Sequence, residues 1–137
     1  MTKTILVVDD EKDVADTLER LLVGEGFHVK VAYGGKEAID LIENEHFDIV
    51  ITDIHMPGID GFEVMRCVKA KNEETRVIVL TGCYLNTNAK EFLRNNGVFD
   101  YISKPIENID TFLSVVRETF ERRRLSIGKK HLEKSTR

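Results

Sequence analysis

Five polar side chains in this sequence stand at the ends of short strand-like runs, where their types and spacing suit chemistry. An acidic pair follows Ile5–Val8, and a single acid follows Ile49–Thr52. Val77–Leu80 leads to a threonine, and Tyr101–Ser103 leads to a lysine. Short runs rich in β-branched residues, bounded by turn-forming Pro and Gly, are typical of buried strands. The polar residues at their ends are Asp9, Asp10, Asp53, Thr81 and Lys104.

These side chains are predicted to form one site, because ligands bind outside the carboxyl ends of the strands in an open parallel sheet. Three carboxylates at about 6 Å repel one another by roughly 3 kcal/mol per pair at an effective dielectric near 20. Such a cluster indicates a hard cation, and Mg²⁺ suits one or two carboxylates completed by water and phosphate. Lys104 offers a positive charge to an anion, and Thr81 offers a hydroxyl. The set matches phosphoryl transfer, in which a carboxylate can itself be the nucleophile.

The segments between these residues predict the elements that position them. Strand-like and helix-like patterns alternate five times, with short connections, which favours a parallel sheet covered by helices on both faces. The run Phe27–Ala32 alternates apolar with polar residues, so we expect it at a sheet edge. The predicted fold is α/β, a flavodoxin-like doubly wound (βα)5 sandwich of three layers with strand order 2-1-3-4-5. The predicted strands are 4–8, 27–32, 49–53, 76–80 and 100–103; the predicted helices are 10–22, 86–95 and 109–120, with two more after Gly35 and Gly61.

Composition sets the class of protein. The 137 residues suit one globular domain, and no apolar run approaches the ~20 residues that span a bilayer. The chain enters a strand at once, without a visible signal peptide, and its two cysteines form no framework, so we expect a cytoplasmic protein. Residues 122–137 carry a formal charge of +6 and the rest carries −10, which argues against nucleic-acid binding by the body.

The spacing of these motifs resembles one known family, the receiver domains of two-component response regulators. Each motif alone is weak, but their order and spacing are specific, and the likeness runs from Thr4 to about Phe120. One mild departure is Gly82, where many members have alanine or serine. The segments that carry the resemblance are Leu6–Glu11, Thr52–Gly61, Thr81–Gly82 and Tyr101–Pro105.

The resemblance implies a role for each site residue. It implies that Asp53 accepts a phosphoryl group from a phosphohistidine of a sensor histidine kinase or phosphotransfer protein. It implies that Asp10, Asp53 and the backbone carbonyl of His55 hold Mg²⁺, with Asp9 acting through water. Lys104 would pair with the phosphate, and its bond to Pro105 would be cis.

The same likeness implies a signalling switch rather than a turnover enzyme. Thr81 would bond the phosphoryl group, and Tyr101 would turn inward as Thr81 moves, remodelling the face formed by residues 86–103. The chain would catalyse only its own Mg²⁺-dependent phosphorylation and dephosphorylation. A plain core position for Tyr101 stays open, because partly buried tyrosines are common.

Three other functions remain as alternatives. A flavin-binding flavodoxin-like protein needs a Ser/Thr/Gly-rich phosphate loop after the first strand, where this chain has Asp9-Asp10-Glu11. A phosphatase with an aspartate nucleophile on that strand would want acids two residues apart, whereas here they are adjacent. A phosphate-independent scaffold would not need the complete set of site residues.

The carboxyl-terminal residues form a separate question. We predict a receiver domain at 1–121 and a basic extension or linker at 122–137, helical to about Ser126 and disordered beyond Gly128. The linker would lead to a partner chain or to an effector domain absent from this chain; a frayed, solvated end is the other reading. Nucleic-acid binding by this tail is a weak hypothesis, and a homodimer is possible.

Overall fold

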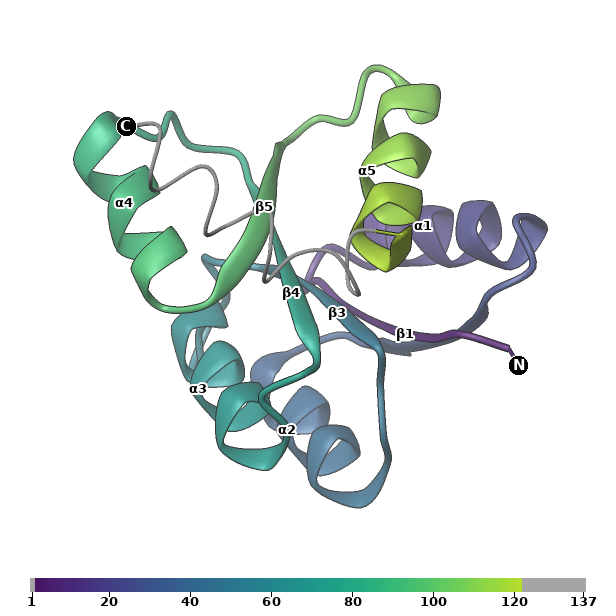
Figure 1. Ribbon diagram of the computed structural model, residues 1–137, viewed down its shortest axis with the longest axis horizontal. Helices are drawn as coiled ribbons and strands as arrows, with labels where there is room; N and C mark the ends of the chain where they lie inside the picture. The colour runs from purple at the N-terminus through teal and green to yellow at the C-terminus, as the bar shows by residue number, and fades with distance from the viewer. Residues whose placement is uncertain (1, 122–137) are drawn as a thin grey trace. The chain divides into compact units, whose positions relative to one another are not determined.

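The computed structural model describes residues 2–121, in which five strands alternate with five helices (Figure 1). The strands are β1 (Thr4–Val8), β2 (His28–Ala32), β3 (Ile49–Asp53), β4 (Arg76–Thr81) and β5 (Val98–Ser103). The helices are α1 (Lys12–Gly24), α2 (Gly35–Asn44), α3 (Gly61–Lys71), α4 (Thr87–Asn95) and α5 (Ile109–Glu121).

The sheet confirms the predicted topology. All strand pairs are parallel, and the order is β2-β1-β3-β4-β5. β2, whose sequence alternates, lies at one edge, and β5 lies at the other. The crossover from β1 to β2 and the crossover from β2 to β3 run in opposite directions across the sheet, so the carboxyl ends of β1 and β3 flank the point where the winding reverses.

The core fills both faces of this sheet. Leu6 and Val8 of β1 belong to an apolar cluster with buried residues of α2 and α3, the two helices that lie together on one face (Figure 1). Ile5 and Val7 are equally buried and point to the opposite face, because side chains alternate along a strand. That face is covered by α1 (Figure 1).

Two predicted elements, the first helix and the fifth strand, had boundaries that were wrong by two residues, and the first helix also ends at Gly24 rather than Leu22. The first helix begins at Lys12 rather than Asp10, because Asp10 and Glu11 form an extended turn in which Asp9 Oδ1 accepts a hydrogen bond from the Glu11 N–H at 2.9 Å. The fifth strand begins at Val98 rather than Asp100, and a register shift beside Val77 and Ile78 lets it pair early with β4.

One glycine fixes how α3 meets the end of β3. A Cβ built at Gly61 would lie 2.2 Å from the Asp53 carbonyl oxygen, so only glycine permits this approach. The Asp60 side chain accepts a hydrogen bond from the Glu63 N–H and begins the helix.

The chain divides into two compact units, Met1–Pro105 and Ile106–Arg137. The first holds the whole sheet, α1 to α4 and every predicted site residue. Of the second, the structure describes residues 106–121, where the Asn108 side chain caps the start of α5. The predicted helical extension to Ser126 and disorder beyond Gly128 lie outside the described residues. Within residues 2–121, no helix has the length and apolar character needed to cross a membrane.

Candidate functional site

Three carboxylates meet at the carboxyl ends of β1 and β3. Asp9, Asp10 and Asp53 each place one oxygen within 4.8 Å of the others. Asp9 is fully buried and Asp53 is 5% exposed, whereas Asp10 is exposed. The juxtaposition follows from the topology, since β1 and β3 are adjacent parallel strands and the acids end or follow them.

Lys104 reaches this cluster from β5, two strands beyond β3. Its N–H donates to the Thr81 carbonyl at 2.8 Å, and its bond to Pro105 is cis, as predicted. The Nζ atom lies 2.9 Å from Asp9 Oδ2 and 3.0 Å from Asp53 Oδ2. The side chain is only 11% exposed, so the ammonium lies in a partly desolvated position between two buried acids.

Burial and the neighbouring polar groups shift two pKa values. Burial by itself would lower the pKa of Lys104, but hydrogen bonds to Glu11, Asp9 and Asp53 outweigh it and raise the pKa above its ordinary value. Burial raises the pKa of Asp9, although the Glu11 N–H and the Lys104 ammonium act in the opposite direction. The ammonium therefore stays charged. It compensates the charges of the buried acids Asp9 and Asp53, which are disfavoured by loss of water.

Thr81 ends β4 close to this cluster, but its hydroxyl is bound within its own loop. The Oγ1 atom accepts a hydrogen bond from the Cys83 N–H at 3.1 Å and lies 3.4 Å from the Cys83 carbonyl oxygen. The side chain is buried, at 1% exposed. Thr81 thus lies at the sheet edge that carries the cluster, and its own loop supplies the partners of its hydroxyl.

His55 contributes main-chain groups rather than its imidazole. Its N–H donates to Asp53 Oδ1 at 3.3 Å, and its side chain is exposed. This contact holds the loop after β3 against the carboxylate.

Tyr101 is the one predicted residue that lies apart from the carboxylates. It sits within β5 opposite Val79, packs against the apolar cluster and is half-buried. The Lys90 ammonium of α4 lies 5.4 Å from the centre of its ring. Tyr101 is therefore placed between the core and α4, on the 86–103 face.

A cleft of about 530 Å³ opens onto the cluster and contains residues that the sequence did not single out. Glu11 is the most informative of them, because its Oε1 lies 2.6 Å from Lys104 Nζ and makes a third carboxylate partner for the ammonium. In the sequence, only its position directly after Asp9 and Asp10 could have indicated that Glu11 belongs to the site. The lining residues are Glu11, Val14, Asp53, His55, Gly82, Cys83, Lys104 and Pro105.

The donor set fits a divalent hard cation. Carboxylate oxygens grouped within 4.8 Å of one another, with one acid exposed to water, are the ligands that Mg²⁺ prefers. No histidine or cysteine joins the group among the described residues, which disfavours zinc.

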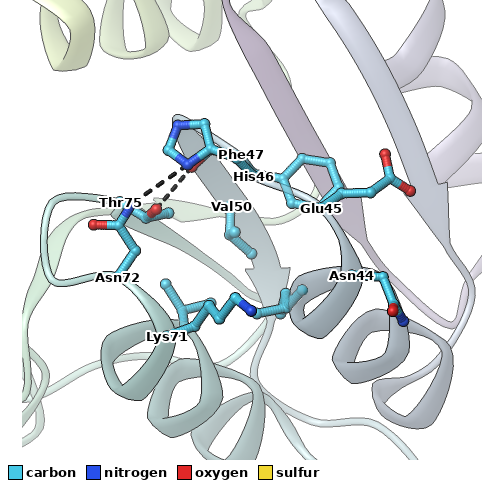
Figure 2. Close-up of a pocket in the computed structure, with 10 residues that line it drawn as sticks. Asn44, Glu45, His46, Phe47, Val50, Lys71, Asn72 and Thr75 are labelled. Carbon is cyan, nitrogen blue, oxygen red and sulfur yellow. Dashed lines mark hydrogen bonds between the residues drawn. The ribbon is translucent and has the colours of Figure 1, made fainter.

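A second cavity, of about 240 Å³, lies at the opposite end of the sheet, where β3 and β4 begin (Figure 2). Its polar groups already have partners in the protein. Asn72 Nδ2 lies 3.3 Å from His46 Nδ1, the Thr75 hydroxyl donates to the Phe47 carbonyl, and Lys71 Nζ donates to the Glu43 carbonyl. The satisfied rim indicates a structural junction between α2 and α3 rather than a ligand site.

The fold and the site together define a class of protein: an α/β domain with an acidic cluster and a lysine at the carboxyl edge of its sheet. The sequence matches the response regulator receiver domain family over residues 5–117. The chain belongs to this family, the receiver domains of two-component systems, which act as phosphoacceptors rather than as classical enzymes.

Solved structures agree with that assignment. A CheY-like receiver domain protein from Methanospirillum hungatei is 29% identical, with a TM-score of 0.84 over 92% of this chain and 99% of that one. The receiver domain of Francisella response regulator 1452 is 30% identical, with a TM-score of 0.79 over 88% and 98% of the two chains. The chemotaxis protein CheY4 of Vibrio cholerae is 26% identical, with a TM-score of 0.79 over 87% and 99%.

Proposed function

We propose that Asp53 accepts a phosphoryl group from a phosphohistidine of a sensor histidine kinase or phosphotransfer protein. The observation that carries the proposal is the placement of its carboxylate. It ends a buried central strand, lines a cleft and lies 3.0 Å from the Lys104 ammonium, beside two further acids. A buried acid with a single cation and an open approach suits a nucleophile better than a structural ion pair.

The transfer step balances without a co-reactant. One Asp53 oxygen attacks phosphorus in line with the imidazole nitrogen of the donor. The O–P bond forms as the P–N bond breaks, the imidazole keeps the electron pair and takes up a proton from water, and Asp53 becomes an acyl phosphate. Charge on the transferred group is spread over its three outer oxygens, so positioning and neutralisation supply most of the catalysis.

This chain's own residues would divide that work. Lys104 brings its ammonium to one phosphoryl oxygen, and the His55 N–H holds the loop beside the acceptor. Asp10, Asp53 and the His55 backbone carbonyl would hold Mg²⁺, with Asp9 acting through water. Bound there, the ion supplies further neutralisation of the phosphoryl oxygens.

Signalling would begin at Thr81. A phosphoryl oxygen is a stronger acceptor than the Cys83 carbonyl, so the Thr81 hydroxyl would exchange its loop partner for the phosphoryl group. The loop before α4 would follow, and Tyr101 would turn into the space released. The 86–103 face would then present a different surface to an output partner, as a two-state element biased by local charge.

Hydrolysis would return the switch to its starting state. Water attacks the phosphorus of the acyl phosphate, inorganic phosphate leaves, and the Asp53 carboxylate is restored. The chain would therefore act on its own phosphoryl group rather than turn over an external substrate.

The proposed phosphodonor also bears on where the domain acts. A sensor kinase needs cellular ATP, so we expect the domain to act in the cytoplasm. The acidic cleft repels the phosphate of a flavin, which disfavours the flavodoxin alternative. The output partner stands as an unidentified protein or effector domain, and a homodimer is compatible with the proposal.

Intact-mass spectrometry after incubation with acetyl phosphate and Mg²⁺ tests the proposal. We expect the wild type to gain one phosphoryl group, Asp53→Asn to gain none because an amide is not a competent nucleophile, and removal of Mg²⁺ to suppress labelling. Asp40→Asn, an exposed acid on α2, is the matched control and should label as the wild type does. Full labelling of the Asp53 variant would overturn the assignment.

A further inference from the structure

The Lys104 ammonium has three hydrogen-bond donors, and in this structure three carboxylates face it. Asp9 Oδ2, Glu11 Oε1 and Asp53 Oδ2 lie at 2.9, 2.6 and 3.0 Å. A phosphoryl group on Asp53 needs one of these donors, so one existing partner must give way.

The partners differ in how readily they can be released. Asp9 is fully buried, and losing the ammonium would leave its charge without compensation at large cost. Asp53 is the acceptor itself. The Glu11 side chain is 62% exposed, so water can replace the ammonium as its partner.

We propose that Glu11 is a positioning residue that competes with the incoming phosphoryl group for Lys104. This inference rests on the proposed function of Asp53 and adds a restraint on it. Glu11 holds the lysine ammonium in the resting state. This contact slows phosphorylation until the donor displaces the Glu11 carboxylate.

The Glu11 side chain does not stabilise the helix that it precedes. It stands at the N-cap position of α1, but its side chain makes no capping hydrogen bond to that helix. Its backbone N–H, which bonds Asp9, is kept in any variant other than proline. Substitution should therefore leave the fold intact.

The test is the second-order rate constant for labelling by acetyl phosphate at saturating Mg²⁺, measured by intact-mass spectrometry of quenched samples. We expect Glu11→Gln to react about 1.5-fold to fivefold faster than the wild type, the range of an exposed ion pair. Asp13→Asn, an exposed acid two residues along the same helix, makes the same change in net charge and should react at the wild-type rate.

A double-mutant cycle separates competition for Lys104 from a general structural effect. Introduced into a Lys104→Met background, Glu11→Gln should leave the rate unchanged, because no ammonium remains to be released. An equal acceleration in both backgrounds, or equal rates for Glu11→Gln and the wild type, would overturn the inference while leaving Asp53 as the acceptor. Absence of wild-type labelling would overturn the proposed function and this inference with it.

Discussion

Replacement of Lys104 by methionine should expose how much the acidic cluster depends on one ammonium. The variant keeps a chain of similar length but removes the cation that lies within 3.0 Å of two buried carboxylates. Removing one partner of a buried ion pair costs about 3–5 kcal/mol. Asp9 retains its hydrogen bond from the Glu11 N–H, so we expect the lower end of that range, about 3 kcal/mol, in the absence of divalent cations.

Urea unfolding in the presence of EDTA measures this loss directly. For a domain of this size, about 3 kcal/mol corresponds to a fall in Tm of roughly 10 °C. The loss of unfolding free energy should shrink when Mg²⁺ is added, because a bound cation would compensate the charges of Asp9 and Asp53 in place of the ammonium. Lys36→Met, at an exposed position on α2, is the matched control and should change the free energy of unfolding by less than about 0.5 kcal/mol.

Two results would refute the reasoning. A loss below about 1 kcal/mol for Lys104→Met would mean that the acids are already compensated without the ammonium, as for a surface pair. An equal deficit with and without Mg²⁺ would mean that the acids and the proposed cation site are separate.

Two further predictions concern the metal and the switch. Mg²⁺ at a hundred times its Kd should stabilise the wild type by about 2.7 kcal/mol, and Asp10→Ala should lose most of the matching rise in melting temperature; an equal rise in both proteins would contradict the ligand assignment. Addition of beryllofluoride should shift backbone amide signals across residues 86–103, and Thr81→Ala should confine those shifts to the cleft. Shifts confined to the cleft in the wild type as well would count against the switch.

The sequence predicted the fold well because its patterns report burial directly. The apolar runs of β1 and β3 indicate central strands, and the alternating pattern of β2 indicates an edge strand. Right-handed crossovers then restrict the possible strand orders to a few. Asp9, Asp53 and Lys104 follow as one cluster, since each ends or follows a parallel strand and those ends share one edge.

The details that the sequence missed depend on side-chain rotamers and distant contacts. Lys104 meets Glu11 across 93 positions of sequence, and no local pattern encodes that its ammonium contacts this acid as well as Asp9 and Asp53. The Thr81 hydroxyl bonds within its own loop, a choice that depends on the backbone path to Cys83. The early start of β5 depends on a register shift against β4, which a propensity pattern does not reveal.

The central claim is that Asp53 carries the phosphoryl group as an acyl phosphate. The most direct test is borohydride reduction of the labelled protein, which converts an aspartyl phosphate to homoserine, followed by peptide mass mapping. The proposed function predicts homoserine at position 53 and at no other aspartate, only when phosphodonor and Mg²⁺ are both present. Homoserine at Asp9 or Asp10 in place of Asp53, or a phosphoryl group that resists reduction on a histidine or serine, would contradict it.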